Sequence, residues 1–270
     1  MASRSLLCVH AHPDDEALFT AGTTLHYSRR GVRTILITCT LGQLGIDGHG
    51  LAGAVPGHDA LATRVTRAGE LQRAGVLVGY DRLISLGHLD SGMSGWATNE
   101  DPDAFINADV DATARVVADI IDQEDAAVVV TYDEGGFYGH PDHVMANVIT
   151  RRAVAMSARA RRLFYPVIPR GVLGTFLERA RARDVFLPAW VENAVADIPD
   201  DAVDCVMDVA HFSALKQEAI ATHASQVDNA DFVTMDPEMF NLLLGTEYYQ
   251  VGWQRDGVSL ACGDDLFGGL

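Results

Sequence analysis

Histidine and aspartate residues gather at two points in the chain, each shortly after an apolar run. The first group, HAHPDDE at residues 10–16, follows the run 6–9, and the second, YGHPDH at residues 138–143, follows the run 127–132. In α/β proteins, binding sites form beyond the carboxyl ends of the sheet strands. If both runs are strands, the two groups are expected to face one pocket.

Imidazole and carboxylate groups together form a donor set for a metal ion. A catalytic zinc ion takes three protein ligands from His, Asp or Glu and leaves one position for water. Pro13 fixes a backbone dihedral and disfavours helix before it, so the turn can be stiff. The adjacent Asp14 and Asp15 cannot point the same way, so one can bind metal while the other acts as a base. If the Asp pair stood alone, the simpler interpretation would be that it caps a helix. The second histidine and aspartate group, at residues 138–143, favours a metal site instead.

The histidines and the tyrosine of these groups allow several roles. His10 lies two residues before His12, on the same face of a strand. It could be a second ligand, but a buried histidine with a neighbouring partner is the simpler interpretation. His140 and His143 could both reach the pocket, and one of them would then be available for acid–base chemistry near neutral pH. Tyr138 could donate to a developing oxyanion or pack beneath a loop.

Taken together, the two groups make the chain resemble a known family. VHAHPDDE and TYDEGGFYGHPDHV, within residues 4–154, are similar to motifs of the LmbE-like, PIG-L family of zinc-dependent N-acetylglucosaminyl deacetylases. Within that family the chain resembles the mycothiol-pathway branch, which includes the deacetylase of N-acetylglucosaminyl-inositol and the mycothiol conjugate amidase. Weaker similarity continues at residues 223–226 and 247–248.

The resemblance implies a Rossmann-like α/β fold, in which a mostly parallel sheet is flanked by helices, and a site built around zinc (Zn²⁺). It implies that the metal ligands are His12, Asp15 and His143; iron(II) (Fe²⁺) suits the same ligands. It also implies that Asp14 is the general base, that His140 is a general acid that stabilises the oxyanion, that Asp142 orients His140, and that Tyr138 donates on the oxyanion side.

Three further positions match residues that line the family's sugar pocket, namely Arg67, Asp90 and Met93. This role for Arg67 rests on the resemblance, because helical position alone would make it a solvated residue. The loop 42–46 carries Gln43, Leu44 and Ile46 where the mycothiol branch tends to have glutamates, and the turn 134–137 also departs from its usual Pro-Asn and glycine. Neither change touches a ligand or the base, so we expect catalysis to persist beside a more apolar aglycone pocket.

The predicted reaction is hydrolysis of the N-acetyl group of a small molecule that contains N-acetylglucosamine. The same site could cleave a larger amide, such as a thiol conjugate, or deacetylate an aminoglycoside or glycopeptide intermediate. A non-catalytic sugar-binding protein would not need both Asp14 and His140. A phosphoesterase would need a second set of metal-binding carboxylates, which is not evident. NAD binding is not expected, because no GxGxxG follows the first strand.

Alternating apolar runs and helical periodicity surround the two groups and must position them. We predict strands over 6–10, 34–39, 82–86, 127–132 and 163–168. We predict helices over 16–30, 60–78 and 142–158, and a further helix that has Asp111 as its N-cap. After residue 169 the pattern loosens to helices at 175–183 and 212–224, a helix starting at Asp236, and strands at 205–207 and 247–253. This order predicts parallel strands with right-handed crossovers and one domain over 1–270, with a core of about 1–170 and a C-terminal elaboration of about 171–270.

Composition limits the partners of the chain. Its 270 residues are 48% hydrophobic, enough for a sizeable core, and its net charge of −17 disfavours nucleic acid and anionic membranes. No apolar run approaches the roughly 20 residues of a membrane span, a signal-peptide pattern is lacking, and the four cysteines lie far apart. We therefore expect a cytoplasmic protein with a small-molecule amino-sugar substrate; the sequence leaves a homo-oligomer open.

Overall fold

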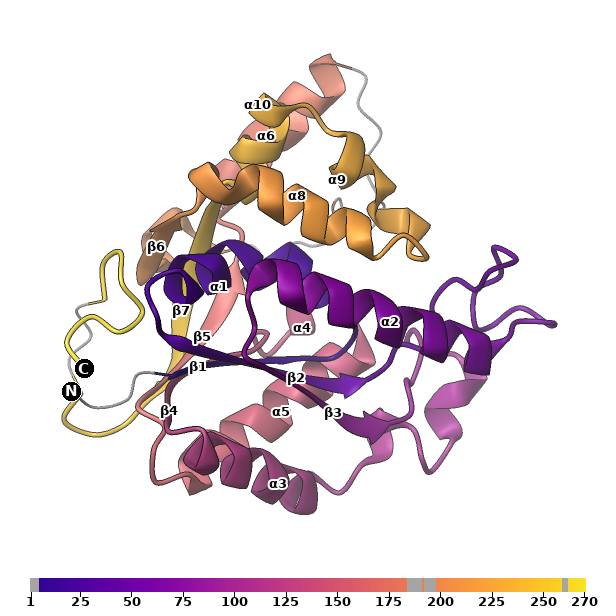
Figure 1. Ribbon diagram of the computed structural model, residues 1–270, viewed down its shortest axis with the longest axis horizontal. Helices are drawn as coiled ribbons and strands as arrows, with labels where there is room; N and C mark the ends of the chain where they lie inside the picture. The colour runs from indigo at the N-terminus through magenta and orange to yellow at the C-terminus, as the bar shows by residue number, and fades with distance from the viewer. Residues whose placement is uncertain (1–4, 184–190, 192–197, 259–261) are drawn as a thin grey trace.

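One seven-stranded sheet runs through the computed structural model, which describes residues 5–183, 191, 198–258 and 262–270 (Figure 1). The strand order is β3-β2-β1-β4-β5-β7-β6. Five strands are parallel, namely β1 (Ser5–His10), β2 (Arg33–Thr40), β3 (Arg82–His88), β4 (Ala126–Val130) and β5 (Arg162–Val167). β7 (Thr246–Gln254) and β6 (Cys205–Asp208) continue the sheet antiparallel. The predicted Rossmann-like, mostly parallel sheet is confirmed.

Helices cover both faces of this sheet, as Figure 1 shows. Those of the first part are the π-helical turn η1 (Glu16–Thr20), α1 (Ala21–Ser28), α2 (Ala60–Val78), α3 (Val110–Gln123), α4 (Gly136–Gly139) and α5 (Pro141–Met156). The C-terminal part adds the described helices α6 (Arg170–Ala182), α8 (Ser213–Thr222), α9 (Ala230–Thr234) and α10 (Pro237–Leu244), which lie above α1 and α2 in this view. Short 3₁₀ turns lie at Ala97–Glu100, Phe105–Asn107, Asp200–Ala202, Ala210–Phe212 and Val227–Asn229. α1 and α2 lie on one face, and α3 and α5 on the other.

Side-chain caps fix where several helices begin. The carboxylate of Asp59 accepts from the backbone N–H of Ala62 at the start of α2, and Asp236 caps α10 ahead of a proline. α3 is capped by Asp109, whose carboxylate accepts from Ala112 N at 3.0 Å. The prediction of Asp111 as this N-cap was wrong. The helix begins at Val110, so Asp109 is the residue in the capping position and Asp111 lies in the first turn.

The central strands are buried on both faces. All six residues of β1 are buried, and in β2 only Arg33 is exposed. Such continuous apolar runs are typical of parallel strands that are covered by helices on both sides. All four cysteines are buried and unpaired, as expected for Cys8 and Cys39.

The C-terminal part is joined to the first part through the sheet and through buried polar contacts. β7 pairs with β5, and α8 packs against α2. The carboxylate of Glu247, on β7, accepts from the backbone N–H groups of Gly22 and Thr23 at the start of α1, each at 2.9 Å. Its Oε1 is also 2.6 Å from the buried Lys216 Nζ of α8. These contacts support the proposed single domain.

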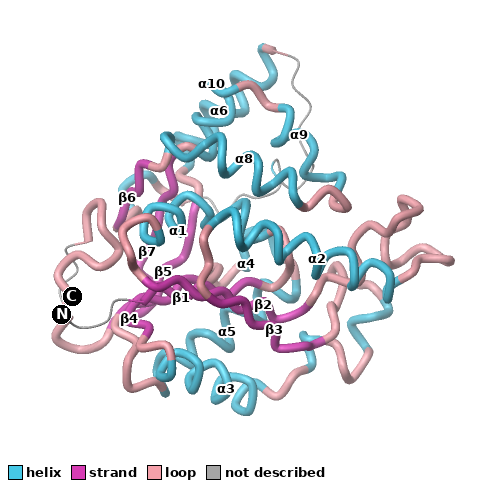
Figure 2. Tube along the Cα trace, in the orientation of Figure 1, coloured by secondary structure: helices cyan, strands magenta, loops and turns pink. Residues whose placement is uncertain are grey.

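Two long loops leave the carboxyl ends of β2 and β3, as Figure 2 shows. The first, residues 41–59, is held by Asp47, whose carboxylate accepts from the backbone N–H groups of His49, Leu51 and Asp59. The second covers residues 89–109 and contains two 3₁₀ turns. Among the described helices, none has the length and apolar character required to span a bilayer.

Candidate metal centre and catalytic pocket

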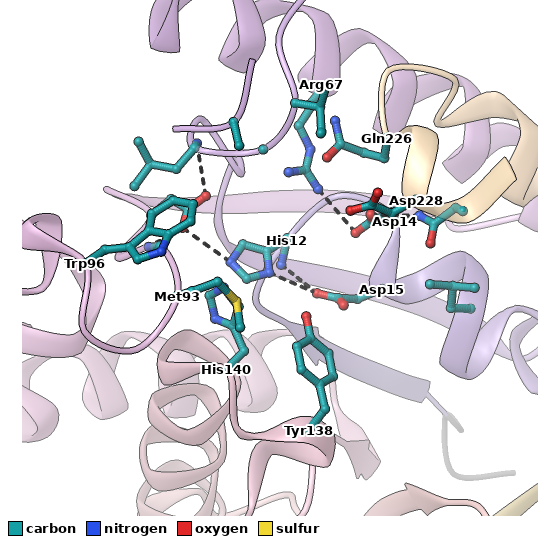
Figure 3. Close-up of a pocket in the computed structure, with 18 of the residues that line it drawn as sticks. His12, Asp14, Asp15, Arg67, Met93, Trp96, Tyr138, His140, Gln226 and Asp228 are labelled. Carbon is teal, nitrogen blue, oxygen red and sulfur yellow. Dashed lines mark hydrogen bonds and ion pairs between the residues drawn. The ribbon is translucent and has the colours of Figure 1, made fainter. Parts of the chain in front are cut away.

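A pocket opens at the carboxyl ends of the parallel strands, and most of the predicted site residues line it (Figure 3). Its cavity volume is about 280 Å³. The predicted residues among its lining are His12, Asp14, Asp15, Arg67, Asp90, Met93, Tyr138 and His140. Asp142 and His143 lie beneath these residues and are fully buried.

The turn after β1 directs its two aspartates apart. The backbone N–H of His12 donates to Asp15 Oδ2 at 2.8 Å, which folds Asp15 back under the turn. Asp14 has a φ of 115°, a conformation that residues other than glycine rarely adopt. Its backbone N–H donates to Glu16 Oε2 at 2.9 Å, which helps to hold this strained backbone. Asp15 therefore faces the histidines, while Asp14 faces the other side of the pocket.

Asp15 lies between two histidines that come from the two sequence groups. Its Oδ1 is 3.4 Å from His143 Nε2, and its Oδ2 is 3.5 Å from His12 Nδ1. The hydroxyl of Tyr132 donates to Oδ2 at 2.6 Å and fixes the carboxylate from below. The structure thus brings together the three residues predicted as metal ligands.

In each of the two histidines, one ring nitrogen points away from Asp15 and makes a hydrogen bond. These hydrogen bonds determine where the proton of each ring lies. His143 Nδ1 donates to the carbonyl oxygen of Gly136 at 3.2 Å, and His12 Nε2 donates to Asp142 Oδ2 at 3.1 Å. A carbonyl and a carboxylate can only accept, so in the neutral rings His143 Nε2 and His12 Nδ1 are the nitrogens that carry the lone pair. His143 Nε2 is buried without a hydrogen-bond partner in the described part of the chain. Metal-binding histidines commonly have such outer acceptors, so the donor set fits a divalent cation.

His140 lies close enough to join a different donor set, since one ligand atom each from His12, His140 and His143 lies within 4.8 Å of the others. However, His140 Nδ1 accepts from the backbone N–H of Asp142 at 3.1 Å, which places the ring proton on Nε2. Burial lowers the pKa of His140 well below its usual value, and the neighbouring His12 and His143 lower it further. We therefore interpret neutral His140 as a hydrogen-bond donor.

The structure gives Asp142 a different partner from the expected one. Its carboxylate contacts His12 and accepts from the backbone N–H of Ser91 at 3.0 Å, whereas only its backbone N–H contacts His140. Asp142 is the second residue of α5, and its side chain reaches His12 in the turn after β1. It orients a predicted metal ligand directly and His140 only through the main chain.

Asp14 is held by a cation and an amide from other parts of the chain. Arg67 Nη2 is 3.2 Å from Asp14 Oδ1, and Asn229 Nδ2 donates to Asp14 Oδ2 at 3.1 Å. Burial raises the pKa of Asp14, and Asp15 raises it further, although Arg67 acts in the opposite direction. A partly buried carboxylate with a raised pKa is suited to act as a general base.

Arg67 is buried, so the interpretation from helical position as a solvated residue was wrong. Its side chain is 4% exposed and donates to the carbonyl oxygens of Pro13 and Gly42. A Cβ atom at Gly42 would lie 2.3 Å from the guanidinium, and one at Gly45 would lie 2.4 Å from it. The two glycines therefore allow the loop after β2 to close around the cation, a contact that helical periodicity cannot reveal.

Tyr138 lies on the side of the pocket opposite Arg67, and its hydroxyl is directed toward Asp15 (Figure 3). The residue before it, Phe137, has a φ of 67°, which breaks the short helix α4 and turns the tyrosine into the pocket. Burial raises the pKa of Tyr138 well above its usual value, so the phenol keeps its proton and can donate it.

Several residues of the site were not predicted. Gln226, Asp228 and Asn229 line the pocket from the C-terminal part, where only the weak similarity at residues 223–226 gave a signal. In the same segment, His223 Nε2 is 2.6 Å from Glu16 Oε1, with both side chains fully buried.

His10 has the structural role that its position suggested. Its Nε2 lies 2.9 Å from Thr20 Oγ1, and its ring is fully buried beside Tyr132. The simpler interpretation of a buried histidine with a neighbouring partner is confirmed.

Comparison with known proteins adds independent evidence. The family model described as "PIG-L: GlcNAc-PI de-N-acetylase" matches residues 7–154. The 1D-myo-inositol 2-acetamido-2-deoxy-alpha-D-glucopyranoside deacetylase of Salinispora arenicola is 36% identical, over 100% of this chain and 92% of the relative.

Two solved structures share the architecture. The N,N'-diacetylchitobiose deacetylase of Pyrococcus horikoshii matches with a TM-score of 0.60 at 17% identity, over 93% of this chain and 84% of its own. The 4-carboxy-2-hydroxymuconate hydratase GalB of Pseudomonas putida KT2440 matches with a TM-score of 0.62 at 15% identity, over 95% and 99%. Because their named reactions differ, these likenesses are evidence for the fold alone.

Proposed function

The chain belongs to the PIG-L family, and from this we propose that it is a metal-dependent hydrolase that removes the N-acetyl group from a small molecule containing N-acetylglucosamine. The observation that carries the proposal is that the side chains around Asp15 form two separate sets. His12, Asp15 and His143 direct their donor atoms at one another, while Asp14 and His140 lie beside them in the same pocket with other partners.

We propose that His12, Asp15 and His143 hold a zinc ion; iron(II) suits the same donors. When bound, such an ion activates water as a nucleophile and polarises the amide carbonyl. Asp14 accepts the proton that the attacking water loses. Its contacts with Arg67 and Asn229 aim the carboxylate and leave it outside the ligand set.

On the other side of the amide, His140 and Tyr138 act as donors. His140 carries its proton on Nε2, from which it can donate a hydrogen bond to the developing oxyanion. The proton that Asp14 has taken from water passes to the amine nitrogen as the C–N bond breaks. The phenol of Tyr138 gives a second hydrogen bond to the same oxygen. Preorganised donors of this kind in a water-poor site are usually a large contribution to catalysis.

The proposal is tested by incubating metal-analysed protein with a panel of N-acetylglucosaminides and measuring free amine and acetate. We expect equal amounts of both products, and we expect a chelator to abolish their release until zinc or iron(II) is restored. The panel also includes N-acylated sugars with longer acyl groups and a set of phosphoesters. Release of phosphate, with no amine from any sugar, would overturn the proposal.

A further inference from the structure

The catalytic pocket has two chemically different sides. Figure 3 shows Arg67, Gln226 and Asp228 together with Asp14 on one side of His12, and Trp96 with Met93 on the other. The first side offers guanidinium, amide and carboxylate groups, which are suited to the hydroxyl groups of a sugar. The second side offers few hydrogen-bonding side chains.

Five apolar side chains make up this second side, which we call the apolar wall: Leu44, Ile46, Ala52, Met93 and Trp96. They come from the two loops that leave β2 and β3. Met93 is 41% exposed although it lines the pocket. Contact with a ligand would remove this apolar surface from water, which is favourable.

Close contacts with glycine backbone hold two side chains of the apolar wall in place. Gly53 N donates to the carbonyl oxygen of Leu44 at 3.0 Å, and a Cβ atom on Gly53 would lie 2.6 Å from Leu44 Cβ. A Cβ atom on Gly92 would lie 2.4 Å from the ring of Trp96. Both large side chains therefore pack directly on glycine backbone, and little ordering cost remains for binding.

Asp90, the carboxylate next to this wall, is occupied in joining its two loops. Its Oδ2 accepts from the backbone N–H of Leu44 at 3.1 Å, and its Oδ1 accepts from that of Gly92 at 2.8 Å. A hydroxyl group that faced the wall would therefore compete with main-chain donors. A site without partners for hydroxyl groups discriminates against ligands that carry them.

We propose that the apolar wall binds the aglycone, and that the substrate is an N-acetylglucosaminide with an uncharged alkyl or aryl aglycone. This inference rests on the proposed deacetylase function. An aryl group can stack on the indole of Trp96 and cover Leu44 and Ile46. The acidic lining, with Asp14, Asp15 and Asp228, disfavours an anionic aglycone.

The test compares kcat/KM for four N-acetylglucosaminides that carry methyl, butyl, 4-methylphenyl and inositol aglycones, with amine release as the readout. We expect the 4-methylphenyl and butyl compounds to exceed the inositol compound by about tenfold or more. Ile46→Glu should remove most of this preference, because it should lower kcat/KM for the 4-methylphenyl and butyl compounds much more than for the methyl glycoside. Leu44→Glu provides a second variant if Ile46→Glu does not fold.

Val55→Glu is the matched control, because Val55 belongs to the same loop, is 43% exposed and does not line the pocket. It should behave as the unmodified protein with all four glycosides. Equal or faster turnover of the inositol compound, or an unchanged preference in a folded Ile46→Glu or Leu44→Glu variant, would overturn the apolar aglycone site. No amine from any glycoside, methyl included, would instead count against the deacetylase function.

Discussion

Asp14 and Asp15 are neighbours in the chain, yet their environments separate them. Asp15 accepts from Tyr132 and from the backbone of His12, and the nearby His143 and His12 keep its pKa well below the usual value in spite of burial. Asp14 contacts Arg67 and Asn229, and burial raises its pKa. The positive φ of Asp14 is the backbone feature that makes this separation possible.

Replacing the base should stop the reaction without removing the metal. Asp14→Asn keeps the size of the side chain and one oxygen that accepts hydrogen bonds, but an amide cannot take a proton from water. We therefore expect acetate release to fall by about 10²- to 10⁴-fold. Elemental analysis should find unchanged metal content. Asp103→Asn, on an exposed loop, is the control and should retain full activity. Turnover near that of the unmodified protein in Asp14→Asn would remove the base assignment.

The two histidines of the second group should respond differently to substitution. We expect His143→Ala to lose metal, because it removes Nε2, the ring nitrogen that faces Asp15. We expect His140→Ala to keep metal and to lose turnover, because the ring nitrogen that faces the pocket carries a proton. Metal content by elemental analysis and amine release separate the two effects. Loss of metal in His140→Ala would favour the alternative donor set of His12, His140 and His143.

At the scale of elements, the end of α8 supports the turn that carries Asp14. His223 follows α8 and pairs with Glu16, whose other oxygen accepts from the backbone of Asp14. Because both partners are fully buried, loss of one leaves the other without its partner in the core. This contact links the C-terminal part to the base through one side chain.

Removing His223 should therefore lower stability strongly. We expect His223→Ala to reduce the free energy of unfolding by about 3–5 kcal/mol, as for other broken buried pairs, measured by urea denaturation. The double variant with Glu16→Gln should lose less than the sum of the single changes. His211→Ala is the matched control, since His211 is exposed in the same segment. Additive losses would show that the two residues are not coupled.

Glu124 joins the end of α3 to the starts of two strands. Its carboxylate pairs with Arg33 at the start of β2, at 2.7 Å, and with Arg82 at the start of β3. Burial alone would raise the pKa of Glu124, but the two arginines outweigh it and lower the pKa below 4.5. The stabilisation is thus present above that pH and is lost as the pH falls through the lowered pKa.

Glu124→Gln should accordingly be less stable than the unmodified protein near neutral pH, and the difference should shrink as the pH falls below 4.5. Urea denaturation at several pH values measures this difference. Glu134→Gln is a suitable control, since Glu134 lies in an exposed pair with Arg151 and should show little effect at any pH. A difference that grows on acidification would contradict the assigned direction of the shift.

The elements were more predictable than their contacts. Helix α2 occurs over the predicted residues 60–78, because its cap, periodicity and terminal glycine are all local in sequence. The burial of Arg67 and the contact of Asn229 with Asp14 depend on segments that are far apart in the chain. Sequence periodicity indicates local structure and does not predict such contacts. The antiparallel direction of β6 and β7 likewise comes from tertiary packing.

On the scale of the whole molecule, the proposed single domain depends on contacts that cross from the first part to the last. Glu247 receives hydrogen bonds from α1 and pairs with Lys216, the only lysine in the sequence. β7 lies between β5 and β6, so the sheet itself crosses the boundary near residue 170. Separate unfolding of the last hundred residues would expose one edge of β5 and leave Asp14 without Asn229.

We therefore expect one cooperative unfolding transition, with tryptophan fluorescence and far-ultraviolet circular dichroism giving the same midpoint. Lys216→Met should shift both midpoints together to lower temperature, because it leaves the buried Glu247 carboxylate without its cation. Arg181→Met, on the exposed side of α6, is the control and should leave both unchanged. Two resolved transitions, of which Lys216→Met moves only one, would indicate two domains that fold separately, and the C-terminal groups at the pocket would then be held by a domain interface.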